Sequence, residues 1–346
     1  MLIKSLKLND YRNYNKYSTT FNPHLNIIVG KNGVGKTNLL ESILVVSNAK
    51  SFRTLNDQDL IQKGKEYLKI DLESDLNNHK VIINQNNKSL YINDNLAKKT
   101  SDYIGKMNAI LFKPSDLEIF TESPNERRKI LDLEIGKINK NYLRSILSYN
   151  SLLKDKNKLL KEIEIDKKLL SIIEESMIPH IKTIIEEREK FINNINEHIT
   201  TFYNEISGQQ NTIKVEYKKC SEISDIKNNL LKAKQKDEQY KYSTFGPHRE
   251  DFNFIISGYD ANSVASQGQK RMIVIAFKFS LIKYIKENAN TIPILLLDDI
   301  LSELDKENQE RLLNTLPKDV QVIITNTNIN NIDINQEYKL IEIKEN

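Results

Sequence analysis

Short apolar runs dominate the first third of the chain and predict β-strands. Some runs alternate apolar with polar side chains, which indicates one buried face, and others are continuously apolar, which indicates burial on both faces. Asn-rich turns separate three of the middle runs, so the short connections predict a small antiparallel sheet there. The runs cover residues 2–8, 17–21, 25–29, 67–72, 80–84, 89–92 and 107–112.

Between residue 123 and about residue 207 the pattern becomes helical and charged. Ser123 has the chemistry of an N-cap, with Pro124 at the first helical position and Glu126 as its capping partner. Further along, apolar residues recur at gaps near three and four, interrupted by Arg188, and form a heptad-like stripe. The stripe contains Met177, Ile181, Ile184, Phe191, Ile195, Ile199, Phe202 and Ile206.

A helix over residues 143–165 would supply the partner face for this stripe. Two antiparallel helices of about 35 residues would project roughly 50 Å at a rise of about 1.5 Å per residue. Pro179 lies inside the second helix and predicts a kink or a break. The alternative is an ordinary helical subdomain packed on the core. The partner face contains Leu152, Leu153, Leu159, Leu160 and Ile163.

After Gly208 the chain returns to shorter elements. Strands are expected over residues 213–217, 251–256, 292–297 and 320–324, and helices over residues 223–236 and 272–285. We therefore expect an α/β head built from residues 1–120 and 241–346, interrupted by a helical, coiled-coil-like arm over residues 121–240. A chain of 346 residues is long enough for two domains or for one domain with a large insertion.

Composition excludes several classes of protein. Lys plus Arg total 51 against 47 for Asp plus Glu, and a net charge of +4 neither demands nor excludes a polyanionic partner. Cys220 is the only cysteine, which excludes an intrachain disulfide and a multi-cysteine zinc site and fits a reducing compartment. No stretch approaches the roughly 18 apolar residues of a membrane span. We therefore expect a cytoplasmic protein with no membrane partner.

The segment GKNGVGKT has the spacing of a phosphate-binding P-loop and lies between an expected strand and an expected helix. Its glycines let backbone N–H groups turn toward phosphate oxygens at the positive end of that helix. We expect Lys36 to reach the β- and γ-phosphates and the Thr37 hydroxyl to ligate Mg²⁺. The expected nucleotide-binding residues are Gly30, Lys31, Asn32, Gly33, Val34, Gly35, Lys36, Thr37 and Asn38. On its own the loop leaves kinase, GTPase and motor ATPase open.

The apolar run IPILLL ends in Asp298 and Asp299. This pattern is typical of a buried parallel strand that delivers two carboxylates at its C-terminal edge. We expect Asp298 to hold Mg²⁺ directly or through water, and Asp299 to orient or deprotonate the attacking water. Helix capping is the structural alternative for paired acids after a strand. The upstream P-loop favours the catalytic interpretation.

The segment SQGQ, which contains Ser266, Gly268 and Gln269, precedes a long apolar helix. A serine and a glycine at a helix N-terminus predict a second anion-binding end. An N-cap role explains Ser266 equally well. The position of the segment about thirty residues before the Asp298 strand favours the anion-binding interpretation.

Six motifs, in one order, carry a resemblance to a known family. The P-loop, SQGQ and the Asp298 strand, with a helical insertion between the first two, resemble the ABC-type ATP-binding heads of the SMC-like DNA-repair ATPases. SMC and Rad-type members carry much longer coiled coils, so the short insertion is similar to that of the RecF family. The motifs are LIKSLKLNDYRNY, GKNGVGKTNLLESI, SFRT, TFGPHREDF, SQGQ and LLLDDILSELD.

The resemblance implies a homodimer that forms on ATP. Lys36 and Thr37 of one subunit would hold ATP, and Ser266 of the other subunit would close on its γ-phosphate. Asp305 ends the segment SELD, which matches the D-loop that crosses the dimer interface in this family. Such a dimer would couple nucleotide state to DNA affinity, because ATP contacts that exist only in the closed state favour that state.

Two departures from transporter-type cassettes predict slow hydrolysis. Asp299 stands where those cassettes have Glu, and residues 325–327 (TNT) stand where they have a switch histidine. A shorter carboxylate and no switch imidazole fit an ATPase whose hydrolysis times release from DNA.

The resemblance also implies a role in recombinational repair at gaps and junctions of single- and double-stranded DNA, where RecR and RecO help to install RecA. DNA contacts should be mostly to phosphates, because nothing in the chain resembles a base-reading module. Lys154, Lys156 and Lys158 are interpreted as a solvated face. Two other functions stay open: an ABC-type motor subunit that does not act on DNA, and an ATP-gated interaction clamp without catalysis.

Overall fold

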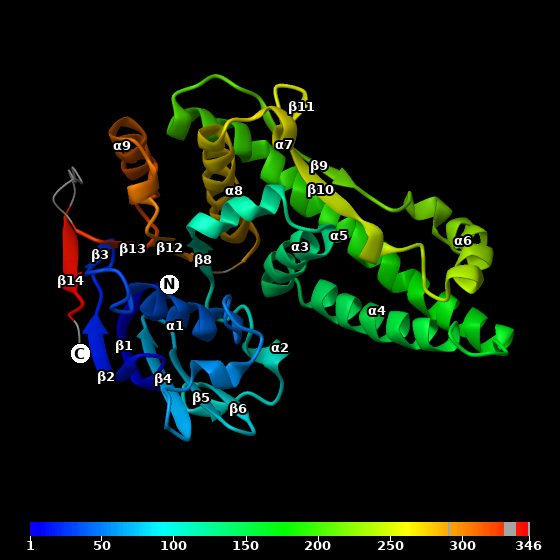
Figure 1. Ribbon diagram of the computed structural model, residues 1–346, viewed down its shortest axis with the longest axis horizontal. Helices are drawn as coiled ribbons and strands as arrows, with labels where there is room; N and C mark the ends of the chain where they lie inside the picture. The colour runs from blue at the N-terminus through cyan, green and yellow to red at the C-terminus, as the bar shows by residue number, and fades with distance from the viewer. Residues whose placement is uncertain (290, 329–336, 345–346) are drawn as a thin grey trace. The chain divides into compact units, whose positions relative to one another are not determined.

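The computed structural model describes residues 1–289, 291–328 and 337–344 and divides the chain into two compact units (Figure 1). The head unit comprises Met1–Asp116, Thr201–Gln210 and Val274–Asn346, and the arm unit comprises Leu117–Thr200 and Asn211–Ile273. These boundaries differ from the expected ones, because residues 241–273 group with the arm unit and residues 201–210 with the head unit. Strand pairing explains the first difference, since β10 (Asp251–Ile256) pairs with β9 (Ile213–Lys218).

A five-stranded parallel sheet forms one layer of the head unit, in the order β14-β3-β13-β12-β8. Its central strands are buried and mostly apolar, as expected for strands covered on both faces. The parallel register places Asp298, at the end of β12, opposite Thr325 of β13. The strands are β3 Leu25–Val29, β8 Ala109–Phe112, β12 Ile294–Asp298, β13 Val322–Asn326 and β14 Tyr338–Glu342.

A six-stranded antiparallel sheet forms a second layer of the head unit, in the order β2-β1-β4-β5-β6-β7. It contains the strands predicted between residues 67 and 92, and the first two strands of the chain extend it. Buried and more exposed residues alternate along β4 and β5, so one face of the sheet is apolar. The strands are β1 Ile3–Tyr11, β2 Tyr14–Thr20, β4 Tyr67–Ser74, β5 Asn78–Asn84, β6 Lys88–Ile92 and β7 Asn95–Leu96.

Helix α1 (Lys36–Asn48) joins the two sheets of the head unit. It contacts β4 and β5 of the antiparallel sheet and β8 and β12 of the parallel sheet. The apolar core accordingly combines residues of both sheets with α1, as Leu6, Leu40 and Leu296 illustrate. The helix that follows the P-loop is thus held firmly in the core. The head unit also contains α2 (Thr100–Tyr103), α9 (Lys306–Thr315) and the later part of α8 (Gln267–Asn288).

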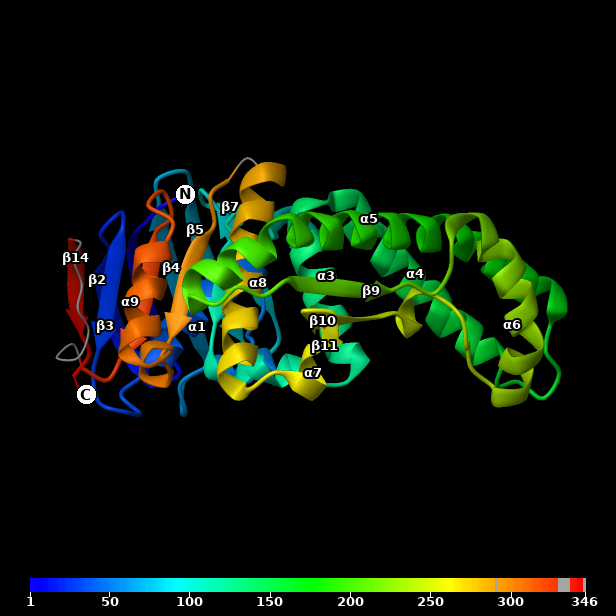
Figure 2. The ribbon, with the colours of Figure 1, turned by 90° about the horizontal axis from the view of Figure 1, so that it is seen from above.

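Helices form most of the arm unit, together with an antiparallel sheet in the order β11-β10-β9. The long helix α5 (Lys167–Ser207) runs beside α4 (Lys140–Leu159) (Figure 2). The arm unit also contains α3 Pro124–Ile138, α6 Ile226–Tyr240, α7 Ala261–Val264, β11 Tyr259–Asp260 and the first part of α8. No helix in the described ranges is long and apolar enough to cross a membrane.

The apolar stripe predicted on α5 is buried, apart from Phe202, which is half-buried. Arg188, which interrupts the stripe, is buried as well. The helix continues through Pro179, which contradicts a break at that position. Ser123 is the N-cap of α3 and Pro124 follows it, but the Ser123 side chain makes no capping hydrogen bond.

The predicted partner face on α4 is only partly correct. Leu159 and Leu160 are buried, but the side chain of Ile163 is fully exposed, because α4 ends before it. Lys156, interpreted from the sequence as solvated, is buried and forms ion pairs with Glu174 and Asp237. The face of α4 that points inward therefore combines apolar side chains with a paired charge.

Candidate nucleotide-binding site

The P-loop has the strand, loop and helix arrangement that its sequence predicts. Gly33 and Gly35 have φ values of 87° and 115°, a region that glycine enters without steric cost. A Cβ on Gly35 would lie 2.6 Å from Nδ2 of Asn13, so a side chain at this position would collide with the β1–β2 turn. That turn also holds the loop: Asn13 Nδ2 donates to the Val34 carbonyl at 2.8 Å, and the Tyr14 hydroxyl donates to the Gly35 carbonyl at 3.0 Å.

Lys36 is the buried cation of the loop, with 7% of its surface exposed. Its Nζ donates to the carbonyl oxygens of Gly30 at 2.7 Å and Lys31 at 3.0 Å. Burial lowers its pKa, although the nearby Asp299 and Asp298 carboxylates oppose that effect. Neutral carbonyls are weaker partners for an ammonium group than phosphate oxygens, so the Lys36 side chain is suited to exchange them for an anion.

Asp298 connects the end of β12 to the P-loop helix. Its carboxylate accepts hydrogen bonds from Thr37 Oγ1 at 3.0 and 3.1 Å, and from Thr325 Oγ1 at 2.7 Å. Burial raises the pKa of Asp298, while the hydrogen bonds from Thr325 and Thr37 oppose the rise. A hydroxyl and a carboxylate at contact distance form an oxygen donor set, which is the chemistry that Mg²⁺ prefers. The predicted pair of Mg²⁺ ligands is therefore brought together.

Asp299 occupies a sharp turn at the edge of the sheet. Its φ of 51° is unusual for a residue other than glycine, and its N–H donates to Thr325 Oγ1 at 3.0 Å. Its Oδ1 is buried without a hydrogen-bond partner among the described residues. A strained residue with an orphaned buried oxygen is typical of a functional site, where water or a ligand completes the bonding.

A hollow of about 250 Å³ opens between the P-loop and the two aspartates. Gly30, Lys31 and Val34 do not line it; they line a separate hollow with Ile343, on another side of the loop. Arg53, from the segment SFRT, does line the first hollow, and its Nη1 donates to Asn38 Oδ1 at 2.7 Å. The lining residues are Asn32, Gly33, Gly35, Lys36, Thr37, Asn38, Arg53, Asp298 and Asp299.

Sequence reasoning gave no role to Arg53 or to Thr325. SFRT is one of the six sequence motifs, but its distance from the P-loop along the chain gives no sign that Arg53 reaches the same hollow. The sequence of residues 325–327 indicates only the lack of a switch histidine, whereas in the structure the Thr325 hydroxyl bonds to both Asp298 and Asp299. The register of β12 against β13 provides this contact.

Ser266, Gly268 and Gln269 belong to the arm unit, whereas the hollow belongs to the head unit. Ser266 Oγ accepts the Gln269 N–H at 3.2 Å, and Gln269 Oε1 accepts the Ser266 N–H at 2.9 Å. This reciprocal pair is a capping box, so Ser266 does serve as an N-cap. Ser266 and Gly268 are also exposed, which leaves the helix N-terminus accessible to a ligand from outside the chain.

Asp305, predicted to bind nucleotide across a dimer interface, does not line the hollow. It is exposed and caps α9, accepting the Asn308 N–H at 2.8 Å. Ser302, at the start of the same SELD segment, donates to the Asp299 carbonyl at 2.7 Å. The segment is thus fixed to the edge that carries the aspartates, while Asp305 itself stays on the surface.

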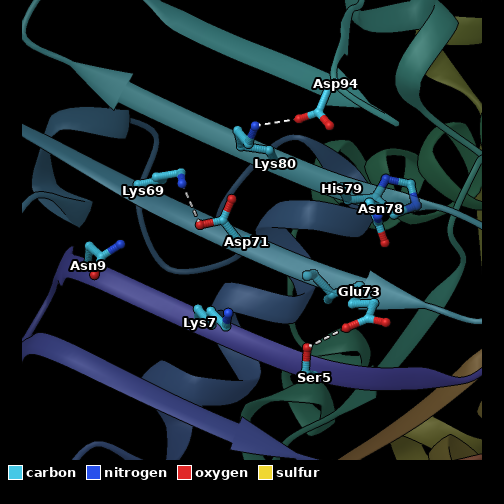
Figure 3. A pocket seen from close by; sticks show the side chains of 11 residues that line it. Ser5, Lys7, Asn9, Lys69, Asp71, Glu73, Asn78, His79, Lys80 and Asp94 are labelled. Carbon is cyan, nitrogen blue, oxygen red and sulfur yellow. Dashed lines mark hydrogen bonds and ion pairs between the residues drawn. The ribbon is translucent and has the colours of Figure 1, made fainter.

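A third hollow, of about 490 Å³, lies over the polar face of the antiparallel sheet (Figure 3). Its charges balance, because three lysines accompany three carboxylates in its lining. Ion pairs join Lys69 with Asp71 at 2.8 Å and Lys80 with Asp94 at 2.6 Å. This hollow therefore lacks the uncompensated positive charge of a phosphate site. The charged residues are Lys7, Lys69, Lys80, Asp71, Glu73 and Asp94.

Fold and site together define a P-loop protein of the ABC and SMC type, with a head unit interrupted by a helical insertion. The sequence profile of the RecF/RecN/SMC N-terminal domain matches residues 2–345. The chain is 40% identical to the DNA replication and repair protein RecF of Acholeplasma laidlawii, over 94% of this chain and 93% of that protein. It is 35% identical to RecF of Clostridium perfringens, over 96% and 94%. The chain belongs to the RecF family.

A solved structure of the recombination mediator protein RecF-ATPrS in the RecFOR pathway has the same fold. It superposes with a TM-score of 0.89 at 32% identity, and the match covers 99% of this chain and 96% of that one. The similarity thus extends over both units rather than over the P-loop region alone.

Proposed function

We propose that this chain is an ATP-dependent DNA-binding protein of recombinational repair that hydrolyses ATP slowly. The contact between Thr37 and Asp298, beside the buried Lys36, carries the proposal. These groups come from segments 261 residues apart, and together they provide a cation for phosphates and oxygen ligands for Mg²⁺. Membership of the RecF family points to ATP as the nucleotide.

Each residue of the hollow has a distinct task in this proposal. Lys36 exchanges its loop carbonyls for the β- and γ-phosphates, and Arg53 adds a second positive charge at the same hollow. Thr37 and Asp298 would hold Mg²⁺, whose charge would offset the negative charge that develops on the phosphates. Asp299 uses its unpaired Oδ1 to orient the attacking water and accept its proton.

Dimerisation would complete the site. The exposed N-terminus of α8, with Ser266 and Gly268, offers N–H groups and a helix dipole to the γ-phosphate held by a second copy of the chain. Lys36 and Arg53 provide the head-unit side of the same nucleotide. ATP that contacts both copies stabilises the closed dimer, and hydrolysis removes that stabilisation and times release from DNA.

By analogy with its relatives, the protein would act in the cytoplasm at gaps and junctions between single- and double-stranded DNA. RecR and RecO are the proposed partners, and the outcome would be the loading of RecA. Phosphate contacts would dominate DNA affinity and make it sensitive to salt.

The test is the rate of ATP hydrolysis with and without gapped DNA, for the wild type and for Lys36→Arg. We expect slow turnover that gapped DNA changes several-fold, and no turnover in the variant, whose bulkier guanidinium does not fit the loop. If gapped DNA changed neither the rate of ATP hydrolysis nor dimerisation, the result would contradict the proposal and favour a motor that does not act on DNA. Binding of ATP without hydrolysis would favour the non-catalytic clamp.

A further inference from the structure

Two exposed tyrosines form a stacked pair on the surface of the arm unit. Tyr240 and Tyr242 expose 55% and 43% of their surface, and their ring centroids lie 5.9 Å apart with an interplanar angle of 24°. The guanidinium carbon of Arg249 lies 5.1 Å from the centre of the Tyr242 ring. Large aromatic side chains normally bury their rings, so an open stack with an attached cation is an unusual surface.

The backbone between the rings forces them together. Tyr240 is the last residue of α6, and Lys241 adopts the left-handed conformation with φ 62°. Its N–H donates to the Asp237 carbonyl at 2.9 Å, which reverses the chain and brings Tyr242 back beside Tyr240. A lysine in this conformation is strained, so the surrounding structure must hold it.

Buried contacts beneath the rings stabilise this conformation of Lys241. Asp237 is buried, pairs with Lys156 at 2.8 Å, and accepts the Thr244 N–H at 2.7 Å. The Ser243 carbonyl accepts a hydrogen bond from Arg249 Nη2 at 3.0 Å. The two rings and the guanidinium are therefore fixed before any ligand arrives, which lowers the entropy cost of binding.

Positive charge leads along α6 to the rings. Lys236 is exposed one helical turn before Tyr240, and Lys232 is exposed two turns before it. Lys241, between the two tyrosines, is exposed as well. In the last turn, Asp237 is buried and pairs with Lys156, and Glu238 is half-buried, so exposed lysines outnumber exposed acids beside the rings. A line of cations that ends at an exposed pair of aromatic rings is complementary to a single nucleic-acid strand. The lysines would contact the phosphates, and a base would stack on a tyrosine ring.

We propose that Tyr240 and Tyr242 form a stacking site for an unpaired nucleobase of single-stranded DNA, with Lys241 and Arg249 beside the adjoining phosphates. The proposal rests on the proposed function and deepens it, because it assigns the single-stranded side of a gap to a named surface of the arm unit. A duplex cannot use this site, since its bases are stacked on one another and present only phosphates and groove edges.

The test compares gapped DNA with a blunt duplex of equal length, in the presence of ATP, for the wild type and the double variant Tyr240→Ala, Tyr242→Ala. We expect the double variant to bind the gapped DNA about 10-fold more weakly and the blunt duplex as tightly as the wild type. Tyr240→Phe with Tyr242→Phe keeps the rings and should bind as the wild type does. Tyr259→Ala is the matched control, since Tyr259 is a 68% exposed tyrosine of the same unit outside this stack.

A fluorescent base gives a second readout that loss of folding alone would not mimic. With 2-aminopurine in the single-stranded gap, the wild type should change its fluorescence on binding, and the Ala variant should leave it unchanged even at saturating protein. Unaltered gapped-DNA affinity in the Ala variant, or an equal loss for the blunt duplex, would overturn the stacking site alone. A wild type that binds neither DNA would overturn the proposed function and the stacking site with it.

Discussion

Buried cations of the head unit and of the arm unit differ in their partners. In the arm unit, Lys156 forms ion pairs with Glu174 at 2.9 Å and with Asp237 at 2.8 Å. Arg188, also buried there, pairs with Glu250 and with a second carboxylate, each at 2.7 Å. In the head unit, the hydrogen bonds that Lys36 makes to described residues go to carbonyl oxygens of its own loop.

This difference separates a structural charge from one that binds a ligand. Removing a charge from water costs free energy unless an opposite charge compensates it. For Lys156 and Arg188 the chain supplies that compensation, so these charges fix how the arm helices pack. For Lys36 the compensation is incomplete, which is why burial lowers its pKa and why an anionic ligand would stabilise its charged form.

The largest expected effect comes from removing a cation in each unit. Lys156→Met leaves Glu174 and Asp237 buried without their partner and should lower the free energy of unfolding by about 3–5 kcal/mol. Lys36→Met should change that free energy by less than about 1 kcal/mol and abolish ATP binding. Urea unfolding and ATP titration of both variants measure the two effects. If the two substitutions destabilised the protein equally, the distinction between a structural cation in the arm unit and a ligand-binding cation in the head unit would be wrong.

A smaller effect concerns one histidine in each unit: His79, which is buried, and His248, which is half-buried. Burial lowers the pKa of His79 in the head unit and of His248 in the arm unit from 6.5 to about 4. Between these values the unfolded chain takes up a proton that the buried ring does not, so stability present above pH 6.5 is lost as the pH falls toward 4. Each histidine should contribute up to about 3 kcal/mol to this loss.

The two histidines should respond differently to replacement by leucine. Neither ring nitrogen of His79 has a hydrogen-bond partner among the described residues, so His79→Leu should flatten the acid dependence at little cost near neutral pH. His248 bonds to the Tyr149 hydroxyl at 2.6 Å and to the Ser243 carbonyl at 3.0 Å. Its replacement should therefore cost about 1–3 kcal/mol at pH 7. Urea unfolding at pH 7 and pH 5 checks both variants, and identical profiles would contradict this prediction.

The smallest expected effect is at the turn that holds the P-loop. Tyr14→Phe removes the hydrogen bond to the Gly35 carbonyl and should cost about 1 kcal/mol of stability. ATP affinity should fall a few-fold, because the loop N–H groups are less well oriented. Tyr67→Phe, at an exposed position of the same unit, is the control and should change neither quantity. An unchanged ATP affinity in Tyr14→Phe would show that the turn does not orient the loop.

Local patterns predicted much of the fold and the centre of the site. Two strands have the expected bounds, those over residues 25–29 and 251–256. Their continuous or alternating apolar runs are typical of β-strands, so the pattern alone determines the element. The P-loop and Asp298 can be recognised in the sequence, because residue types that bind phosphate and Mg²⁺ stand there at the required spacing and beside the expected elements. In both cases the determining interactions are close in sequence.

Features that depend on contacts distant in sequence were not predicted. Lys156 looks solvated beside Lys154 and Lys158 until the fold brings Glu174 and Asp237 to it. Arg53 and Thr325 reach the nucleotide hollow only through the packing and strand register of the head unit. Of the kink or break predicted at Pro179, the break is absent, because a helix packed along its length tolerates the missing N–H.

The most direct test of the account is the oligomeric state of Asp299→Asn with ATP, measured by analytical ultracentrifugation. Asparagine keeps the shape of Asp299 but cannot accept a proton from water, so ATP should persist and hold the chain as a dimer. Adding Ser266→Arg, which places bulk at the exposed end of α8, should return the protein to monomers. An Asp299→Asn variant that binds ATP and stays monomeric would contradict a nucleotide site shared between two copies of the chain.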